Sequence, residues 1–438
     1  MRYFYLFCSL LFLSACSFTP KIEPQQIADL QNIPQSATVY SQGIDKGKIG
    51  DEAAFERAYF SPWNITAFDV PLEKAMWAYN VFTPAKSYGE NLQPLKETFF
   101  DEILENSNFE NYGTINKRAL TLRHLNLRAF PTQRPLLRDP NAAGEGFPFD
   151  YLQNSTIEAN KPLFVSHYSK NREWVFVKSS FAYGWVKTYD IVFIDKKYTD
   201  KWQQAQQIFL TTDNDALYSQ DNNYLFRTHI GMMLPLIDAN NTSNTILSIS
   251  KFQENQPYYR KSNISKAISH NGILTFNAQN INHIIKQLLK VNYGWGGMYG
   301  QRDCSSTMRD FFAPFGIWLP RNSYKQSLIG RVISLKDLSD EEKIARIKKF
   351  AIPFETLLYR KGHIVLYVGT YTDKIVVFQN LWGVKTLKDD KEGRYIIGRT
   401  VFSTLEIGKN LKYYDEKGSL LRGLVSMNIV SEKEESKD

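Results

Sequence analysis

The chain has 438 residues and a formal net charge of +8, and this length predicts about three domains, each with its own core. The 25 Tyr, 29 Phe and 8 Trp residues exclude a mainly disordered protein. The modest positive charge suits anionic surroundings such as a carboxylate-bearing polymer or lipid headgroups. Since no basic run or RNA-binding motif accompanies this charge, we expect no nucleic-acid partner.

The first twenty residues have the pattern of a secretory signal peptide. They carry one positive charge at Arg2, a short apolar run and small residues before Cys16, and the run is too short for a permanent membrane-spanning helix. Leu13-Ser14-Ala15-Cys16 resembles the bacterial lipobox, which implies that Cys16 becomes the lipidated first residue of the mature protein. By analogy with enterobacterial sorting, Ser17 favours the outer membrane. We expect a lipid-anchored periplasmic protein of a Gram-negative bacterium; an ordinary signal peptide with an incidental cysteine is the alternative.

Residues 21–113 are expected to form a mainly helical N-terminal domain. Residues 21–60 are rich in Gln, Ser and Lys and predict a polar, mostly irregular leader. Helical spacing dominates from residue 61 to about residue 108, and it predicts a packing helix that covers another domain or walls off a site. The apolar positions that this spacing places on one face of the helix are Leu95, Phe99, Ile103 and Leu104.

Between residues 114 and 196 the pattern changes to short alternating strands separated by Pro, Gly, Asn and Ser, which predicts a small β-barrel. The pieces LRAFP, EWVFVKS and GWV, in this order, resemble bacterial SH3-like domains. A second β-rich stretch, residues 197–263, includes YLFRTHIGMMLPLID and TILSIS, and we interpret it as a second, diverged SH3-like barrel. Such domains bind or position a peptide, or serve as a passive scaffold.

Residues 264–438 are expected to form the last domain, which begins with an amphipathic helix. The apolar positions of INHIIKQLLK share one helical stripe, and they are Ile281, Ile284, Ile285, Leu288 and Leu289. His283 lies off this stripe, so we expect a solvent-exposed histidine. Residues 431–438, SEKEESKD, predict a charged and frayed tail.

Cys304 is a lone thiol in the expected mature protein. The chain has three cysteines, and Cys8 and Cys16 lie in the predicted signal segment. A lone thiol forms neither an intramolecular disulfide nor a multi-cysteine zinc site. The six histidines are scattered without ligand spacing, so we expect no metal and no other cofactor. The remaining roles for Cys304 are a buried small hydrophobe, an intermolecular crosslink and a nucleophile.

The residues around Cys304 favour the nucleophile. Asp303 is a good N-cap and helical spacing begins at Cys304. The thiol is therefore expected in the first turn of a helix, where the dipole and unpaired N–H groups favour a thiolate and could hold an oxyanion. A core cysteine packed on the face of Met308 and Phe312 is the alternative. A glycine-rich loop is expected before this helix, and its backbone could approach a ligand closely. Its glycines are Gly294, Gly296, Gly297 and Gly300.

Alternating residues further along predict a β-hairpin. One strand covers residues 363–369 and the other residues 374–380, and the link TYTD fits a tight turn. If the turn is centred on Tyr371, the first residue of the hairpin, His363, lies directly opposite Gln379.

This register places a histidine and an amide side by side. His363 and Gln379 share one face of the hairpin, whereas Asn380 points to the other face because side chains alternate along a strand. A base and its orienting partner are what a thiol nucleophile such as Cys304 requires. A strand histidine with a purely structural role is the alternative for His363.

Together these pieces resemble the NlpC/P60 family of cysteine peptidases over roughly residues 265–430. The matching anchors are Tyr293, Trp295-Gly296-Gly297, Asp303-Cys304-Ser305, Leu319-Pro320-Arg321 and Gly362-His363. The resemblance implies an α+β chain in which a papain-like catalytic domain follows SH3-like small β-barrels and a mainly helical N-terminal segment. It implies Cys304 as the nucleophile, His363 as the general base and Gln379 as the third residue. Two positions depart from the commonest pattern, because Gln379 stands where His is more usual and Ser306 stands where Gly is.

The family implies hydrolysis of peptidoglycan stem peptides between the γ-carboxyl of D-glutamate and the diamino acid. In this interpretation, Tyr293 and the backbone N–H of Cys304 are oxyanion partners, and Asp303 and Ser305 hold the free amino group of a terminal L-alanine. In similar multi-domain wall peptidases the N-terminal domains narrow the substrate cleft. The alternatives are a D,D-endopeptidase that cuts cross-links between stems and an inactive wall-binding lipoprotein.

Overall fold

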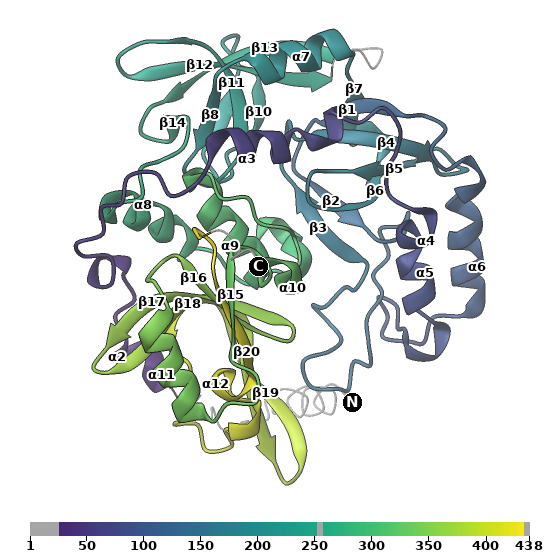
Figure 1. Cartoon of the computed structure of the whole chain (residues 1–438). Coiled ribbons are helices and arrows are strands. Elements are labelled where there is room, and N and C mark those ends of the chain that lie inside the picture. The colour runs from purple at the N-terminus through teal and green to yellow at the C-terminus, as the bar shows by residue number, and fades with distance from the viewer. Residues whose placement is uncertain (1–25, 252–256, 433–438) are drawn as a thin grey trace, which may run out of the picture.

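The computed structural model describes residues 26–251 and 257–432. The predicted signal segment with Cys16, and the last residues of the predicted tail, lie outside the described residues. Within the two described ranges, no helix is long and apolar enough to cross a membrane. Figure 1 shows the C-terminal sheet with its helices on one side of the molecule and two smaller β-rich units beside it.

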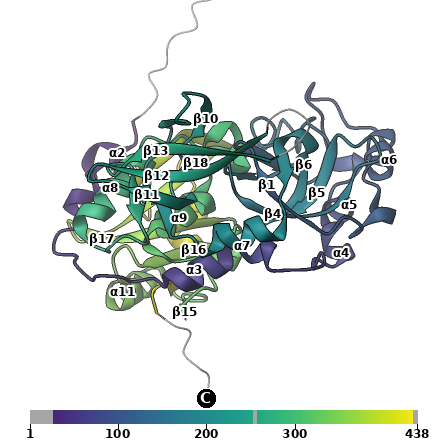
Figure 2. The ribbon, with the colours of Figure 1, turned by 90° about the horizontal axis from the view of Figure 1, so that it is seen from above.

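The N-terminal segment extends across all of these units. Figures 1 and 2 show it passing from α2 beside the C-terminal sheet, past α3 at the second β-rich unit, to α4, α5 and α6 beside the first. Its helices and turns are α2 (Ala28–Asn32), η1 (Ala37–Val39), α3 (Glu52–Tyr59), η2 (Ser61–Trp63), α4 (Leu72–Ala75), α5 (Trp77–Val81), η3 (Pro84–Lys86), α6 (Glu97–Asn106) and η4 (Phe109–Asn111).

The described part of the leader, residues 26–60, is irregular apart from α2, η1 and α3, yet it packs closely on the last domain. Ile27 is buried in an apolar cluster with Leu381 and Val401 of the last domain. The Asp29 carboxylate accepts hydrogen bonds from the backbone N–H and the hydroxyl of Thr404, at 2.6 and 2.7 Å. A polar composition did not reveal these contacts, because they connect positions more than 370 residues apart.

The predicted packing helix near residue 100 is α6, and its apolar face is narrower than the spacing suggested. Phe99 is buried, as is Leu95 just before the helix begins, whereas Leu104 is 45% exposed. Phe99 and Phe100 join the cluster around Phe130 of the first β-rich unit. Leu104 follows Ile103 by one position and is therefore turned by about 100° away from that cluster.

The first β-rich unit is an antiparallel sheet in the order β3-β2-β6-β5-β4-β1-β7. Its inner face is apolar and includes Leu127, Val165 and Val177. The opposite face, with Phe176 and Trp185, packs against Val70 and Ala75 of the N-terminal segment. The bounds are β1 (Lys117–Thr121), β2 (Leu125–Arg128), β3 (Gln153–Ile157), β4 (Pro162–Tyr168), β5 (Trp174–Lys178), β6 (Tyr183–Lys187), η5 (Thr188–Asp190) and β7 (Ile191–Phe193).

The second β-rich unit follows helix α7 (Lys196–Gln204) and contains a sheet in the order β13-β12-β11-β8-β14 and a hairpin of β9 and β10. Its core includes Phe209 and Met233, which share a cluster with Phe55 of α3. The sheet continues to residue 271, past residue 263, where we placed the end of this domain. The bounds are β8 (Gln207–Leu210), β9 (Ala216–Tyr218), β10 (Tyr224–Arg227), β11 (Met233–Ala239), β12 (Ser243–Lys251), β13 (Pro257–Ser265) and β14 (Ser269–Asn271).

The last domain is built on an antiparallel sheet in the order β15-β20-β16-β17-β18-β19. The even positions of β17 and β18, such as Leu366 and Phe378, pack against Phe312 of α9. The strands are β15 (Arg331–Ser334), β16 (Thr356–Arg360), β17 (His363–Tyr371), β18 (Lys374–Lys388), β19 (Lys391–Thr404) and β20 (Leu424–Ile429). The helices and turns are α8 (Ala278–Leu288), η7 (Trp295–Gly300), α9 (Cys304–Phe312), η8 (Ala313–Phe315), α10 (Ser323–Gln326), α11 (Asp340–Phe350), η9 (Glu416–Gly418) and α12 (Leu420–Gly423).

Helix α8 carries the predicted apolar stripe, but its histidine is not free in solvent. Ile281, Ile284 and Leu288 are buried. His283 is half-buried, and its Nε2 lies 3.2 Å from the hydroxyl of Thr211 in the second β-rich unit. Burial lowers the pKa of His283. The expectation of a solvent-exposed histidine is wrong, because the polar side of α8 faces a neighbouring domain.

Candidate active site

Cys304 is the first residue of α9, and the helix start is capped as the sequence predicted. The Asp303 carboxylate accepts a hydrogen bond from the backbone N–H of Ser306 at 2.9 Å, and the Ser306 hydroxyl accepts one from the backbone N–H of Asp303 at 2.9 Å. This reciprocal capping box satisfies two backbone donors at the helix start. Ser306, which replaces the more usual glycine, thus supplies one half of the cap.

The Cys304 thiol is buried, with 8% of the residue exposed. Burial and the neighbouring Asp303 carboxylate raise the pKa of Cys304 to about 12, although backbone N–H groups of Ile364 and Ser305 oppose this rise. Burial lowers the pKa of His363 to about 4. Burial thus favours the neutral form of both groups, whereas the helix start alone favours a thiolate.

The predicted hairpin forms, but in a different register. Its turn consists of Thr372 and Asp373, both with positive φ, which is the two-residue type that matches strand twist. This turn shifts the strand pairing from the predicted one, and a bulge in β17 between residues 367 and 369 shifts it again by one residue. Continuing the pairing past the bulge places Gln379 opposite Val365, diagonal to His363. The expectation of direct pairing is wrong, yet His363 and Gln379 keep the same face because the total shift is two residues.

His363 and Gln379 are in direct contact despite the diagonal register. His363 Nε2 lies 2.8 Å from Gln379 Oε1, and Gln379 Nε2 donates to the Ser403 hydroxyl at 2.6 Å. The same hydroxyl donates its only proton to the carbonyl of Thr404 at 3.0 Å. Ser403 must therefore accept from the amide, and the amide oxygen must accept from His363. This chain of bonds fixes the proton on Nε2 and leaves Nδ1 as the basic nitrogen.

Asn380 points to the other face of β18, as the sequence predicted. Its side-chain amide donates to the carbonyl of Arg302 at 2.9 Å and contacts the Thr307 hydroxyl at 3.3 Å. It therefore holds the chain at the start of α9. The two neighbouring amides have separate roles, since Gln379 contacts the histidine and Asn380 supports the helix that carries Cys304.

The predicted binding residues Asp303 and Ser305 are joined by an arginine that we did not select as a site residue. Arg321 contacts both Asp303 oxygens, at 2.5 and 3.2 Å, and donates to the Ser305 hydroxyl at 2.8 Å. It also donates to the Ser155 hydroxyl of the first β-rich unit at 2.7 Å. Burial would raise the pKa of Asp303, but Arg321 holds it below its usual value. The only sequence signal for this role was the Leu319-Pro320-Arg321 anchor.

Two cavities meet at Cys304, and Tyr293 and Gly362 also line both. The first, of about 320 Å³, contains His363 and Gln379. The second, of about 390 Å³, contains Asp303, Ser305 and Arg321. Burial, reinforced by the neighbouring acidic groups of Cys304 and Asp303, raises the pKa of Tyr293 well above its usual value. Tyr293 therefore keeps its phenolic proton and can donate a hydrogen bond beside Cys304.

The N-terminal parts of the chain form walls of this site. Trp77 of α5, and Tyr151 of the first β-rich unit, line the cavity with Asp303. Phe149, from the same unit as Tyr151, lines the other cavity, and its ring lies 5.4 Å from that of Trp382. Aromatic rings from separate units therefore line the two cavities that meet at Cys304.

The glycine-rich loop before Cys304 makes a different close approach from the one predicted. Gly296 and Gly297 have positive φ, and a Cβ on either would lie 2.4 Å from an atom of β3, namely the Gln153 carbonyl or the Thr156 hydroxyl. The absent side chains thus let the loop pack against the first β-rich unit. Gly296 also lines the cavity that contains Asp303 and Cys304, so the predicted approach of this loop to a ligand stays a prediction.

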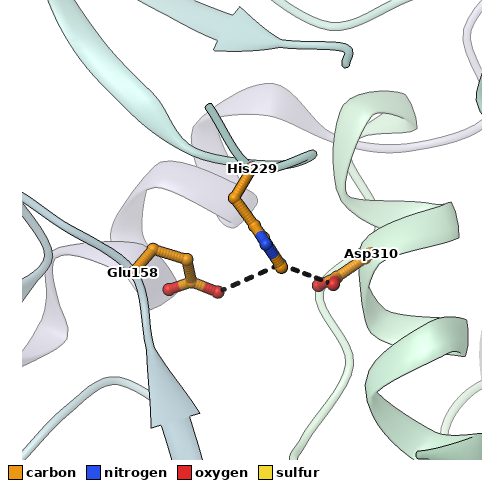
Figure 3. A group of neighbouring side chains, drawn as sticks. All are labelled: Glu158, His229 and Asp310. Carbon is orange, nitrogen blue, oxygen red and sulfur yellow. Dashed lines mark hydrogen bonds and ion pairs between the residues drawn. The ribbon is translucent and has the colours of Figure 1, made fainter. Parts of the chain in front are cut away.

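A second polar cluster joins three parts of the chain away from the thiol. Figure 3 shows His229 between Glu158, after β3, and Asp310 on α9. His229 Nε2 lies 2.8 Å from Asp310 and 3.9 Å from Glu158. Arg302 donates to Asp310 at 2.6 Å, and Lys161 pairs with Glu158 at 3.9 Å. Sequence spacing did not predict this group, because its members are far apart in the chain.

The donor set of this cluster resembles a metal site, since its three ligand atoms lie within 4.8 Å of one another. The surrounding charges already balance it, because Arg302 and Lys161 neutralise Asp310 and Glu158. Burial would raise the pKa of Asp310, but Arg302 and His229 hold it well below its usual value. The arrangement is therefore an ionic contact that fixes α9 to both β-rich units.

We predict that Asp310→Asn weakens this contact. The variant removes the charge that faces both Arg302 and His229, but Arg302 keeps its second partner, Asp213, and the new amide oxygen still accepts hydrogen bonds, so the expected loss is about 1.5–3 kcal/mol in the free energy of unfolding. Urea denaturation would measure it. The control is Asp200→Asn, which removes an exposed ion pair with Lys196 and should change stability by less than about 0.5 kcal/mol. Equal stability of both variants would contradict the prediction.

The fold and the site define the class of the protein. A buried cysteine begins a helix that packs on an antiparallel sheet, a histidine begins a strand of that sheet, and the N-terminal segment and the first small β-unit wall off the cleft. This is a papain-like catalytic domain in a multi-domain α+β chain, which is the predicted fold class.

Comparison with known families identifies the chain more closely. Residues 290–385 match the NlpC/P60 family, and residues 4–112 match the N-terminal NLPC_P60 stabilising domain. Residues 135–187 match an SH3 domain of SH3b1 type, and residues 195–240 match one of SH3b2 type. The chain therefore belongs to the NlpC/P60 family, which is a family of cysteine peptidases. The predicted resemblance, the helical N-terminal segment and both SH3-like units are confirmed.

A solved structure shows the same fold. The chain is similar to an NlpC/P60 endopeptidase from Photobacterium damselae subsp. piscicida, with 24% identity, a TM-score of 0.80, and coverage of 92% of this chain and 98% of that one. It also matches an NlpC/P60 family protein from Bacillus cereus with 16% identity and a TM-score of 0.47, covering 71% of this chain and 99% of that one. No curated protein matches the chain.

Proposed function

We propose that the protein hydrolyses peptidoglycan stem peptides at the amide between the γ-carboxyl of D-glutamate and the diamino acid. Cys304 is the nucleophile, His363 the general base and Gln379 its orienting partner. One observation carries the proposal: all three residues line a single cavity, and His363 Nε2 bonds Gln379 so that Nδ1 remains basic. Family membership supports the peptidase class.

The reaction starts from the neutral pair. His363 Nδ1 takes the thiol proton as the Cys304 sulfur attacks the carbonyl carbon of the γ-amide, so that the thiolate exists only together with the substrate. The negative charge on the carbonyl oxygen is held by hydrogen bonds from Tyr293 and the backbone N–H of Cys304. The imidazolium then protonates the leaving amine, the C–N bond breaks and a thioester remains. Water, deprotonated by His363, attacks the thioester and restores the thiol.

This chemistry assigns a direction to the two cavities. The general acid must reach the leaving nitrogen, so the diamino acid occupies the cavity that contains His363. The acyl part, L-alanyl-γ-D-glutamate, occupies the cavity with Asp303 and Ser305. Asp303 is ionised there, and its charge suits the free amino group of L-alanine, although Arg321 and the helix cap already use both oxygens.

The proposed setting is the periplasmic face of an outer membrane, with Cys16 as the lipid-bearing residue. The support is the lipobox-like Leu13-Ser14-Ala15-Cys16 and the apolar segment before it. Metabolic labelling with a fatty acid, compared between the natural chain and Cys16→Ala, would test the anchor. Equal labelling of both chains would exclude lipidation at this residue.

Digestion of purified muropeptides by the full chain tests the activity. We expect release of the dipeptide L-Ala-D-Glu, read by mass spectrometry, and loss of this product in Cys304→Ala because the thioester cannot form. Conversion of cross-linked dimers to monomers would instead identify a D,D-endopeptidase. Binding without any cleavage would identify an inactive wall-binding lipoprotein.

A further inference from the structure

Basic side chains line the cavity that contains His363. The charged side chains that line it are Arg360, Lys361, Lys385 and Arg394. No aspartate or glutamate of the described residues contributes to its lining. A ligand in this cavity therefore encounters a positive potential, which favours an anionic group.

Two of these cations have carboxylate partners outside the cavity lining. Lys385 pairs with Glu392 at 2.8 Å and with Asp415 at 3.2 Å, and Arg394 pairs with Glu392 at 2.6 Å. Their charges are largely balanced by the protein itself. They add less to anion binding than an uncompensated cation in the same place.

Arg360 differs from these two residues. It is half-buried, and its Nη1 donates only to backbone carbonyls, those of Gly418 at 2.9 Å and Ser419 at 3.1 Å. Within the described ranges, no carboxylate forms an ion pair with it. Arg394 is also close enough to oppose its charge. A half-buried charge without a counter-charge is costly, so a carboxylate that enters the cavity would relieve this cost.

The position of Arg360 ties it to the leaving-group side. Arg360 and His363 are paired residues on the neighbouring strands β16 and β17. On the proposed mechanism, the group beside His363 is the diamino acid. Meso-diaminopimelate and lysine share the same backbone and side-chain length up to the terminal amine, and they differ by a carboxylate on the carbon that carries it.

We propose that Arg360, assisted by Arg394, binds the side-chain carboxylate of the diamino acid and so selects meso-diaminopimelate over lysine. This inference rests on the proposed function. The guanidinium holds its Nη1 edge against the backbone carbonyls, and its planar shape allows a carboxylate to bind the remaining donors. Arg360 thus determines which diamino acid is accepted, whereas Cys304 and His363 carry out the reaction.

The test compares three tetrapeptides, each ending in D-Ala so that the α-carboxyl of the diamino acid is in an amide. They carry meso-diaminopimelate, its side-chain amide, or L-lysine at the third position. The natural chain should cleave the first with a kcat/KM about 10- to 100-fold above the other two, the range for losing one charge-assisted hydrogen bond. The amide keeps the shape of the side chain and removes only its charge.

In Arg360→Gln, the kcat/KM for the meso-diaminopimelate peptide should be at most about threefold above that for the other two peptides. Arg360→Lys should keep part of the natural preference. The control is Lys361→Gln, which removes an exposed charge from the same cavity and should leave the ratio within about twofold of the natural value. Since each ratio is measured within one enzyme preparation, it does not depend on the fraction of folded protein.

Three results would overturn the proposal, and they have different consequences for the proposed function. Equal cleavage of all three peptides by the natural chain, or an unchanged ratio in Arg360→Gln, would exclude Arg360 as the specificity residue while the proposed function stands. No release of L-Ala-D-Glu from any peptide would exclude the proposed function and this inference together.

Discussion

His363→Gln is expected to lower kcat/KM by about four orders of magnitude. The Cys304 thiol has a pKa raised to about 12 by burial and by Asp303, so it cannot ionise at neutral pH without a base. Gln379 and Ser403 hold His363 with its basic nitrogen unoccupied, and a glutamine at position 363 keeps the hydrogen-bonding capacity but cannot take the proton. Initial rates on the meso-diaminopimelate tetrapeptide would measure the loss.

The control for this prediction is the reactivity of the thiol itself. Alkylation of Cys304 by iodoacetamide should be slow at pH 7 in the natural chain and in His363→Gln alike, because neither holds a resting thiolate. A preformed thiolate would react rapidly in the natural chain and lose that reactivity in the variant. Retention of peptide hydrolysis within tenfold would show that His363 is not the base.

The sequence predicted which residues share the candidate site better than it predicted their surroundings. Cys304 was set apart by being the lone thiol, and strand alternation put His363 and Gln379 on one face. His363 and Gln379 are in contact although the predicted register of the hairpin is wrong. The bulge in β17 and the shifted turn together move the strand pairing by two residues, which keeps both side chains on the same face. Alternation determines the face of a side chain but not its partner, so the structure was needed to show the diagonal contact.

The site residues that we did not predict from the sequence contact residues far away in the chain. Ser403 fixes the Gln379 amide from the next strand, and Ser155 of the first SH3 unit contacts Arg321 beside the cysteine. Serine is common in polar stretches and carries no spacing signal of its own. The hydrogen bond between Asp29 and Thr404 was also not predicted from the sequence, because only the fold brings these two positions together.

Arg321→Ala is expected to lower the free energy of unfolding by about 3–5 kcal/mol, the cost of leaving one member of a buried ion pair unpaired. The side chains of Arg321 and Asp303 are 11% and 13% exposed, so solvent screens the pair little. The variant also loses the hydrogen bonds to Ser305 and Ser155, and with them a link between the first SH3 unit and the catalytic domain. Chemical denaturation at pH 7 would measure the loss.

The double variant Arg321→Ala/Asp303→Asn separates charge from packing. Removing the unpaired carboxylate should recover part of the stability, giving a coupling energy between the two sites. The pH dependence gives a second check. Asp303 has a folded-state pKa below its usual value, so its pairing stabilises the natural chain above about pH 4 and is lost as the pH falls through the folded pKa. The difference between natural chain and Arg321→Ala should therefore narrow in acid, and a constant difference would place the effect in packing alone.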